Sequence, residues 1–257
     1  MTRQVVEDSV ATAQIRGMRD HQEDALAVHS LAADAGVHAY ELLLVLADGM
    51  GGHAGGEVAS RLVVDQFCTA YPASPANVPE ALRTSLDVAN ERLAEAAAEA
   101  PQLTGMGTTL IGCVVREDRL FWISVGDSPL WLCRNGALLR LNADHSMRPL
   151  LEDMVRTGLM DRGQAQADPR KNLLRSALTG KTIALVDLCD KPFRLEAGDI
   201  VMLASDGIET LAEAELAVLL QDADTVSLDE LAGKLLAGVE AAGQPYQDNA
   251  SVILYRS

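Results

Sequence analysis

The chain has 257 residues, a length that predicts one large domain rather than two average ones. Acidic residues outnumber basic ones by 37 to 21, which gives a formal net charge of −16. This balance argues against binding to nucleic acid or to an anionic membrane by charge attraction. It is compatible with sites for divalent cations, which prefer oxygen ligands.

The first part of the chain predicts three strands and then two helices. The apolar runs at 9–15, 25–30 and 39–48 are typical of strands. Residues 56–71 and 77–100 place apolar side chains at three- and four-residue steps, which indicates the buried face of a helix.

The rest of the chain predicts further strands and two more helices. Strand-like runs lie at 108–117, 119–127, 129–136, 137–142, 183–190, 199–207 and 250–256, and helical patterns lie at 212–223 and 228–243. Because strands and helices come in blocks, the pattern predicts an α+β fold with antiparallel sheet and helices packed on its faces. The polar segment 146–174, interrupted by Pro, Gly and Asp, predicts a short helix in a mobile surface insertion, of the kind that often borders an active site.

The four cysteines, Cys68, Cys113, Cys133 and Cys189, are far apart and form no CxxC pair. Buried free thiols in a reducing compartment are therefore expected. The N-terminus lacks the apolar core of a secretory signal, and no apolar run reaches transmembrane length. The expected location is the cytoplasm.

Six carboxylates stand where apolar runs begin or end. They are Asp48, Asp127 and Asp206 at the ends of predicted strands, Glu23 and Asp24 immediately before one, and Asp248 at the start of the last. Taken singly, each suits a turn, since Asp-Gly is a common turn dipeptide. Taken together, they predict a divalent-cation site, because clustered acids near a core are costly unless a cation neutralises them. No basic residue adjoins Asp48, Asp206 or Asp248 in the sequence, so no local partner is expected for these three.

The stretch LVLADGMGGHAGGE at 44–57 has five glycines in the eight residues after Asp48. Without a side chain, Gly49 could bring its carbonyl oxygen close to a cation, and the other glycines would let the chain turn sharply beside an open pocket. A phosphate-binding P-loop is the alternative, but the Lys-Ser/Thr pair that such a loop requires is absent.

Eight motifs, in order along nearly the whole chain, resemble those of the metal-dependent serine/threonine protein phosphatases, the protein phosphatase 2C family, in their bacterial form. They are GMRDHQEDA (17–25), LADGMGGHAGGEVAS (46–60), GMGTTL (105–110), ISVGDSPLWL (123–132), NADHSM (142–147), LLRSALTG (173–180), LASDGIETL (203–211) and DNASVILY (248–255). The resemblance implies a four-layer αββα sandwich, with two central antiparallel sheets flanked by helices. Residues 1–257 would form one catalytic domain, with the segment 146–174 as a flap.

The resemblance also implies two manganese or magnesium ions at one end of the sandwich. Asp48 would bridge the ions, Asp206 and Asp248 would complete one of them, and Glu23 with the Gly49 carbonyl would help to hold the other. Two such ions lower the pKa of a bridging water and neutralise charge on the phosphoryl group during in-line attack.

Four further residues have implied supporting roles. Asp24 would position waters, Asn249 would steady the preceding aspartate, and Asp127 together with Asp206 would hold a third, weaker ion. Arg19 would bind phosphate oxygens through its planar guanidinium. The alternative for Arg19 is an exposed ion pair with one of its acidic sequence neighbours, Asp20 or Glu23.

The general acid departs from the pattern of animal members of the family, because Met50 stands where they carry a histidine after Asp-Gly. His53 takes the position usual in bacterial members and is the candidate acid. Its alternative role is to cap the helix that follows near Gly56. His145 is expected to be a structural hydrogen-bonding residue, and His21 could reach the site.

The leading interpretation is a monomeric protein phosphatase that acts on phosphoserine and phosphothreonine and opposes a serine/threonine kinase. A two-metal hydrolase of a small phosphoester would need the same carboxylates, because the ions act on the phosphoryl group whatever carries it. A pseudophosphatase that only binds phosphoproteins would predict missing ligands, whereas every expected carboxylate is present.

Overall fold

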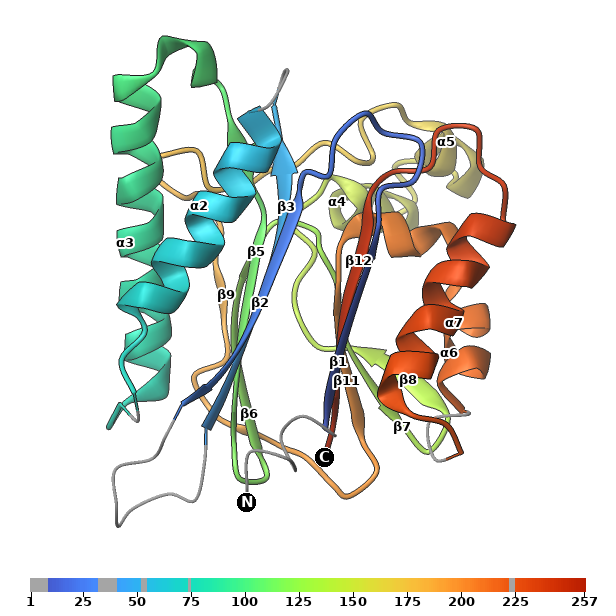
Figure 1. Cartoon of the computed structure of the whole chain (residues 1–257). Coiled ribbons are helices and arrows are strands. Elements are labelled where there is room, and N and C mark those ends of the chain that lie inside the picture. The colour runs from blue at the N-terminus through green and yellow to red at the C-terminus, as the bar shows by residue number, and fades with distance from the viewer. Residues whose placement is uncertain (1–8, 32–40, 52–54, 74, 222–224) are drawn as a thin grey trace.

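A computed structural model describes residues 9–31, 41–51, 55–73, 75–221 and 225–257. Two antiparallel sheets face each other in the centre, and pairs of helices cover their outer faces (Figure 1). This arrangement confirms the predicted α+β, four-layer αββα sandwich.

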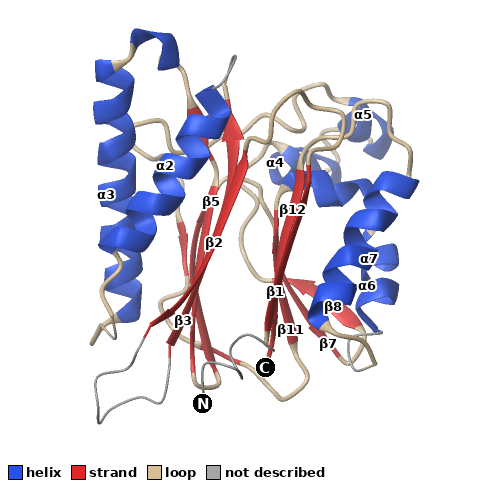
Figure 2. Ribbon diagram, viewed as in Figure 1, coloured by secondary structure: helices blue, strands red, loops and turns tan. Residues whose placement is uncertain are grey.

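The first sheet has seven strands in the order β10-β6-β5-β3-β2, with β4 paired to β3 and β9 paired to β6. These strands are β2 (Asp24–Leu31), β3 (Glu41–Met50), β4 (Gly107–Thr108), β5 (Leu110–Arg116), β6 (Arg119–Val125), β9 (Asp187–Leu188) and β10 (Phe193–Arg194). The helices α2 (Gly55–Ala70) and α3 (Val78–Glu99) cover its outer face, as Figure 2 shows.

The second sheet has five strands in the order β1-β12-β11-β7-β8. These are β1 (Val10–Ile15), β7 (Leu130–Arg134), β8 (Ala137–Arg140), β11 (Ile200–Ala204) and β12 (Ala250–Arg256). Its outer face packs against α6 (Glu213–Leu220) and α7 (Leu228–Ala241). The two-residue turn between β7 and β8 has Asn135 and Gly136 at φ 52° and 75°, the positive values that a tight hairpin turn with the twist of its strands requires.

Three apolar clusters separate the four layers. Leu42, Leu44 and Leu46 of β3 point into the cluster between the two sheets, whereas Leu43 and Val45 point into the cluster under α2 and α3. Successive side chains of a strand point to opposite faces, so a strand covered on both sides is apolar at every position. This explains the uninterrupted apolar run of β3 in the sequence.

Local signals start the helices where the sequence suggests. The Asn77 side chain accepts a hydrogen bond from the backbone N–H of Glu80 at 3.3 Å, and Ser227 does the same for Glu230 at 3.2 Å. These contacts satisfy one of the four N–H groups that the first turn of a helix leaves free.

The structure differs from the sequence prediction at several places. The strand predicted over 183–190 is reduced to β9, and the unpredicted β10 follows it. The segment 146–174, which we call the flap segment, contains two short helices rather than one, α4 (Arg148–Arg156) and α5 (Arg162–Ala167). The strand predicted to end on Asp206 stops at Ala204, and Asp206 begins the 3-10 helix η2 (Asp206–Thr210). A second 3-10 turn, η1 (Pro101–Leu103), follows α3.

All four cysteines are free thiols. Cys113, Cys133 and Cys189 are buried as predicted, whereas Cys68 is only half-buried. Of the helices in the described ranges, none has the length and apolar character needed to cross a bilayer.

Candidate active site

The predicted carboxylates meet at one end of the two sheets. Asp24 lies directly opposite Asp48 in the antiparallel register of β2 and β3, so both side chains share one face. Asp206 follows β11 and Asp248 precedes β12, and because these two strands are antiparallel neighbours, the two acids also come together. Like charges placed directly opposite each other destabilise a sheet, so this arrangement calls for a compensating cation.

A cavity of about 680 Å³ opens at this end of the sandwich. Among the residues that line it are the predicted site residues Arg19, Glu23, Asp48, Gly49, Asp127, Asp206 and Asp248. Residues 172–177 at the end of the flap segment form another side of the cavity. The structure therefore brings together acids that are up to 225 residues apart in the sequence.

The backbone around Asp48 is fixed by the two threonines of the GMGTTL motif. The Asp48 N–H donates to Thr109 Oγ1 at 3.0 Å, and the Asp48 carbonyl accepts from Thr108 Oγ1 at 2.8 Å. Thr109 Oγ1 also contacts Ser128 Oγ at 2.8 Å. The Asp48 carboxylate is thus held on a hydrogen-bonded backbone, with its side chain left free to face the cavity.

Asp24 lies beneath this cavity and is 4% exposed. Its Oδ2 accepts hydrogen bonds from Ser205 Oγ at 2.7 Å and Ser251 Oγ at 2.6 Å, whereas its Oδ1 is buried without a partner. Burial raises the pKa of Asp24 to about 6, against the opposing effect of the two serines. An oxygen left unsatisfied in a buried carboxylate suits a ligand or water that the protein itself does not supply.

Three other aspartates of the site also have raised pKa values. Burial raises the pKa of Asp206 to about 6, and the neighbouring charges of Asp248 and Glu209 add to the effect. Burial, together with the charge of Asp206, raises the pKa of Asp127 to about 7. The pKa of Asp48 is raised well above its ordinary value by burial and by the charges of the other aspartates. Each carboxylate thus resists ionisation because of burial and because of the others.

Arg19 lies against Asp248, with which it forms an ion pair. Neither sequence neighbour, Asp20 nor Glu23, takes this place, and the partner of Asp248 is a distant residue rather than a local one. The pair joins residues 229 positions apart, so no local sequence signal could reveal it. Although partial burial alone would lower the pKa of Arg19, the charge of Asp248 raises it.

The Asn249 side chain contacts the loop between β1 and β2 rather than the neighbouring Asp248. Its Oδ1 accepts from the Glu23 N–H at 2.7 Å, and its Nδ2 donates to the carbonyls of Arg16 at 2.8 Å and His21 at 3.0 Å. Only its backbone N–H contacts Asp248, at Oδ1 and 2.8 Å. Asn249 therefore fixes the loop that carries Arg19 and Glu23.

The glycines after Asp48 and Asp206 allow backbones to approach closely. A Cβ at Gly49 would lie 2.1 Å from the Gly56 carbonyl oxygen, and a Cβ at Gly207 would lie 1.9 Å from that of Asn249. No real side chain fits at such distances. The two Asp-Gly pairs are therefore explained by crowding of the backbone at the site, in addition to any role as turns.

The donor set suits a hard divalent cation. It consists of oxygens alone, with several carboxylates that repel one another, a composition that magnesium and manganese prefer. Within the described ranges, no three His, Cys, Asp or Glu side chains are already drawn together as a complete coordination set. The Arg19–Asp248 ion pair takes up part of the charge that a cation would neutralise. A cation and Arg19 would therefore compete for Asp248.

Some of the histidines lie within the residues that the structure describes, and others do not. His53, the candidate general acid, lies outside the described residues. His145 is buried, and its Nδ1 accepts a hydrogen bond from the Gly126 N–H at 3.2 Å, which confirms its structural role beside Asp127. Burial lowers the pKa of His145, as expected for a neutral acceptor.

Sequence reasoning missed the hydroxyls that support the acids. Ser205 and Ser251 under Asp24, and Thr109 behind Asp48, were quoted within motifs but given no role. Ser205 directly precedes Asp206, and Thr109 follows GMGT, so their proximity to acids was visible only in part. Their partners lie 61 to 227 residues away, which only the paired strands reveal.

The architecture and this site define a class of proteins: αββα sandwiches with a carboxylate-rich cavity at one end of the two sheets. The model of the family Protein phosphatase 2C matches residues 19–231. The serine/threonine phosphatase stp of Listeria monocytogenes is 32% identical over 218 residues, which cover 82% of this chain and 83% of that protein.

Solved structures agree with this match. The crystal structure of the Mycobacterium tuberculosis serine/threonine phosphatase PstP/Ppp superimposes with a TM-score of 0.79 at 29% identity, over 96% of this chain and 97% of that one. The catalytic domain of PstP in complex with two manganese ions gives a TM-score of 0.74 at 28% identity, over 96% of both chains. The chain described here belongs to the protein phosphatase 2C family.

The raised pKa values predict an unusual pH dependence of stability without added cations. Asp24, Asp127 and Asp206 bind protons more tightly in the folded state, with pKa values of about 6, 7 and 6, than in the unfolded chain, where the ordinary value is about 3.9. The stability that they contribute is therefore present below about pH 4 and falls as pH rises to about 7. In EDTA, the midpoint of thermal unfolding should be lower at about pH 8 than at about pH 5.

The variant Asp127→Asn should show a smaller fall, with the midpoint at about pH 8 raised by about 2–4 °C for each kcal/mol of repulsion removed. The exposed Asp87→Asn on α3 is the matched control and should behave like the parent. Parallel pH curves for the two variants would contradict the assignment of strain to Asp127.

Proposed function

We propose that this chain is a metal-dependent protein phosphatase that hydrolyses phosphoserine and phosphothreonine. The observation that carries the proposal is the convergence of Glu23, Asp48, Asp206 and Asp248 with Arg19 around one cavity, in a chain of the protein phosphatase 2C family. We also propose that residues 1–257 form one catalytic domain, with the flap segment beside its cavity.

The cofactor proposed is a pair of manganese or magnesium ions. Asp48, Asp206 and Asp248 would hold them together with Glu23 and the Gly49 carbonyl, and Asp24 would orient waters through its unsatisfied Oδ1. When bound, the ions supply the activation of water and the neutralisation of phosphoryl charge. The named relative with two manganese ions supports this choice of metal.

Arg19 is the group that would hold the substrate phosphate. Its planar guanidinium presents paired N–H donors that match phosphate oxygens. The Arg19 side chain is 50% exposed at the mouth of the cavity, and its partner Asp248 is a proposed metal ligand. Metal binding at Asp248 would release the guanidinium for the phosphate, so one residue serves the two states of the site in turn.

A third, weaker ion is proposed beside Asp127 and Asp206. Asp127 is 5% exposed, lies in the same cavity and shares electrostatic repulsion with Asp206, which favours a further cation there.

Calorimetry at saturating manganese tests this assignment: an equal number of bound ions in Asp127→Ala and in the parent would rule it out.

A phosphoprotein is the proposed substrate, and a serine/threonine kinase with its targets is the proposed partner. Phosphatase names of the relatives support this choice over a small phosphoester, whose hydrolysis would use the same carboxylates. We place the protein in the cytoplasm as a monomer, in keeping with its four free thiols.

The first test of the proposed function is metal dependence. Hydrolysis of p-nitrophenyl phosphate and of a phosphoserine peptide should require manganese or magnesium and stop in EDTA. Asp48→Asn and Asp206→Asn should each lower kcat by about 10³-fold or more, because removing a metal ligand removes the charge stabilisation of the transition state. The control Asp87→Asn should retain full turnover, and activity of the parent in chelator would refute the proposal.

The second test concerns Arg19. In Arg19→Ala, kcat/KM should fall by a factor that corresponds to a loss of about 2–4 kcal/mol of transition-state stabilisation, the range of a charge-assisted contact in a site. Manganese affinity measured by calorimetry should not weaken, because Asp248 loses a competing partner. The conservative Arg19→Lys should recover only part of kcat/KM, since an ammonium cannot bind phosphate in the same bidentate way. Unchanged kinetics in Arg19→Ala would leave Arg19 as an ordinary ion pair of Asp248.

The third test concerns His53 as the general acid. An alkoxide leaving group needs a proton as its bond to phosphorus breaks, whereas nitrophenolate does not, and positioned acid catalysis contributes about 10²–10⁴ in rate. His53→Ala should therefore give a steeper dependence of kcat on leaving-group pKa across a series of aryl phosphates. Parallel lines for His53→Ala and the parent would show instead that His53 only caps the helix or orders its loop.

A further inference from the structure

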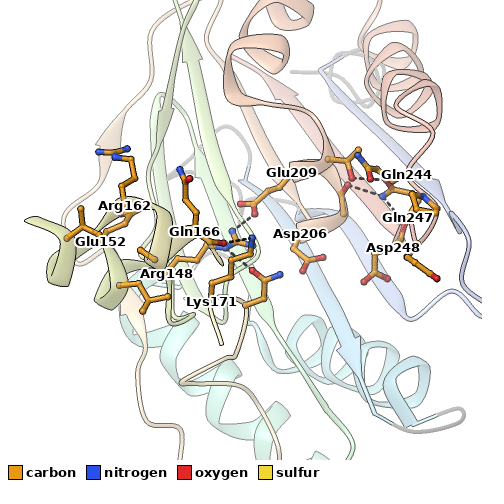
Figure 3. Close-up of a pocket in the computed structure, with 18 of the residues that line it drawn as sticks. Arg148, Glu152, Arg162, Gln166, Lys171, Asp206, Glu209, Gln244, Gln247 and Asp248 are labelled. Carbon is orange, nitrogen blue, oxygen red and sulfur yellow. Dashed lines mark hydrogen bonds and ion pairs between the residues drawn. The ribbon is translucent and has the colours of Figure 1, made fainter. Parts of the chain in front are cut away.

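A second hollow adjoins the active site. It has a volume of about 1180 Å³ and shares Asn172, Asp206 and Asp248 with the active-site cavity, so the two are continuous. Figure 3 shows its two walls: Arg148, Arg162 and Lys171 of the flap segment lie on one side, and Gln244 and Gln247 lie on the other. Asp206 lies between them, so the hollow is a groove that leads away from the carboxylates.

The flap wall of this groove is rich in cations. Arg148, Arg156, Arg162 and Lys171 line it, with Glu152 as the acid on the same wall. Arg148 is paired with Glu209, and Arg156 is paired with Asp153 at 3.0 Å.

Two cations remain available to a ligand. Arg162 is exposed and forms no ion pair with any residue of the described ranges, and Lys171 Nζ donates only to the Gln166 carbonyl at 3.3 Å. Lys171 is likewise exposed beside the cavity.

This charge stands out against the rest of the chain. Residues 146–174 carry five basic and four acidic residues, a net charge of +1. The whole chain has a net charge of −16, so the remaining residues together carry −17. Asp206 and Asp248 contribute negative charge to the floor of the groove, but bound divalent cations would neutralise it. The groove of the metal-loaded protein is therefore cationic on a strongly acidic molecule, which favours an acidic ligand at this place.

Three exposed apolar side chains lie in or near the two connected hollows. Tyr246 in its outer wall is 91% exposed, Leu173 at the edge of the active-site cavity is 57% exposed, and Met18 is 69% exposed. The Met18 N–H donates to the Gln247 carbonyl at 2.8 Å, which places Met18 beside the outer wall. Solvent-exposed aromatic and methionine side chains beside a polar groove are typical of a surface that binds another polypeptide.

We propose that this groove binds the polypeptide on one side of the phosphorylated residue and selects substrates with acidic side chains there. This inference rests on the proposed function. If the phosphoryl group is bound near Asp206 and Asp248, the groove would receive the polypeptide that extends away from it. An extended segment would lie between the flap wall, where Arg162 and Lys171 bind carboxylates, and Tyr246, which packs against the segment's apolar atoms. A small phosphoester would not reach these residues.

The test compares phosphoserine peptides that differ only in the residues flanking the phosphoserine: alanine, glutamate or lysine, placed on the N-terminal or the C-terminal side in separate peptides. With manganese at saturation, kcat/KM for a peptide with glutamates on one side should exceed that of the alanine peptide by about threefold to tenfold, the range of a few exposed ion pairs. The preference should shrink at high salt, since exposed pairs are screened. Lysine on that side should lower kcat/KM below the alanine value.

Charge-reversing variants test whether residues of the flap wall cause the preference for glutamate peptides. In Arg162→Glu and in Lys171→Glu, the ratio of kcat/KM for the glutamate peptide to that for the alanine peptide should fall to about one or below. Glu152→Lys should raise the ratio. The matched control Arg83→Glu makes the same charge change at an exposed position of α3, on the opposite side of the molecule from α5 (Figure 1), and should leave the ratio at the parent value. Because each ratio is measured on one preparation, a variant that folds poorly still gives a valid result.

Tyr246→Ala should raise KM for the alanine and glutamate peptides alike by about threefold or more, since the apolar contact is independent of flanking charge. Equal kcat/KM for all flanking residues, or a glutamate preference that survives both Arg162→Glu and Lys171→Glu, would overturn the groove assignment while leaving the phosphatase proposal intact. Absence of phosphopeptide hydrolysis in the parent would instead refute the proposed function itself.

Discussion

The repulsion between carboxylates at the end of the two sheets is the constraint around which this structure is built. Asp24 and Asp48 lie opposite each other on paired strands, and the charge of Asp206 adds to the repulsion at both. Burial raises the pKa of each, so holding all three ionised costs free energy that the surrounding apolar layers must offset. Threonine and serine hydroxyls fix the backbones and one oxygen of this cluster, which keeps the acids together when no cation is bound.

Much of this arrangement is predictable from the sequence, and the reason is local periodicity. The apolar run of β3 and the helical faces of α2 and α3 identify the layers, and acids at the ends of apolar runs identify the end that carries the site. The Arg19–Asp248 pair and the serines under Asp24 are not predictable in this way, because they depend on which strands become neighbours. The two-residue strands β9 and β10 are missed for a different reason: they are too short to show any alternation.

Charged contacts join the flap segment to the region of the carboxylates. Arg148 at the start of α4 pairs with Glu209, three residues after Asp206 in η2. Arg140 lies 3.6 Å from the same Glu209 and donates to the Asp127 carbonyl at 2.6 Å. These contacts couple the position of α4 to the backbone that carries two of the acids, so a ligand on the flap wall and a cation at Asp206, as proposed, would act on one connected network.

Phosphate binding and metal binding would depend on each other under the proposed assignments. Arg19 pairs with Asp248, and Asn249 holds the loop of Arg19 against β12 through three hydrogen bonds. A divalent cation held by Asp248 would carry twice the charge of the guanidinium and would compete with it for the carboxylate. The guanidinium would then be free beside the cavity to bind a phosphate oxygen, so the proposed metal ligand Asp248 would also govern when the arginine is available to substrate.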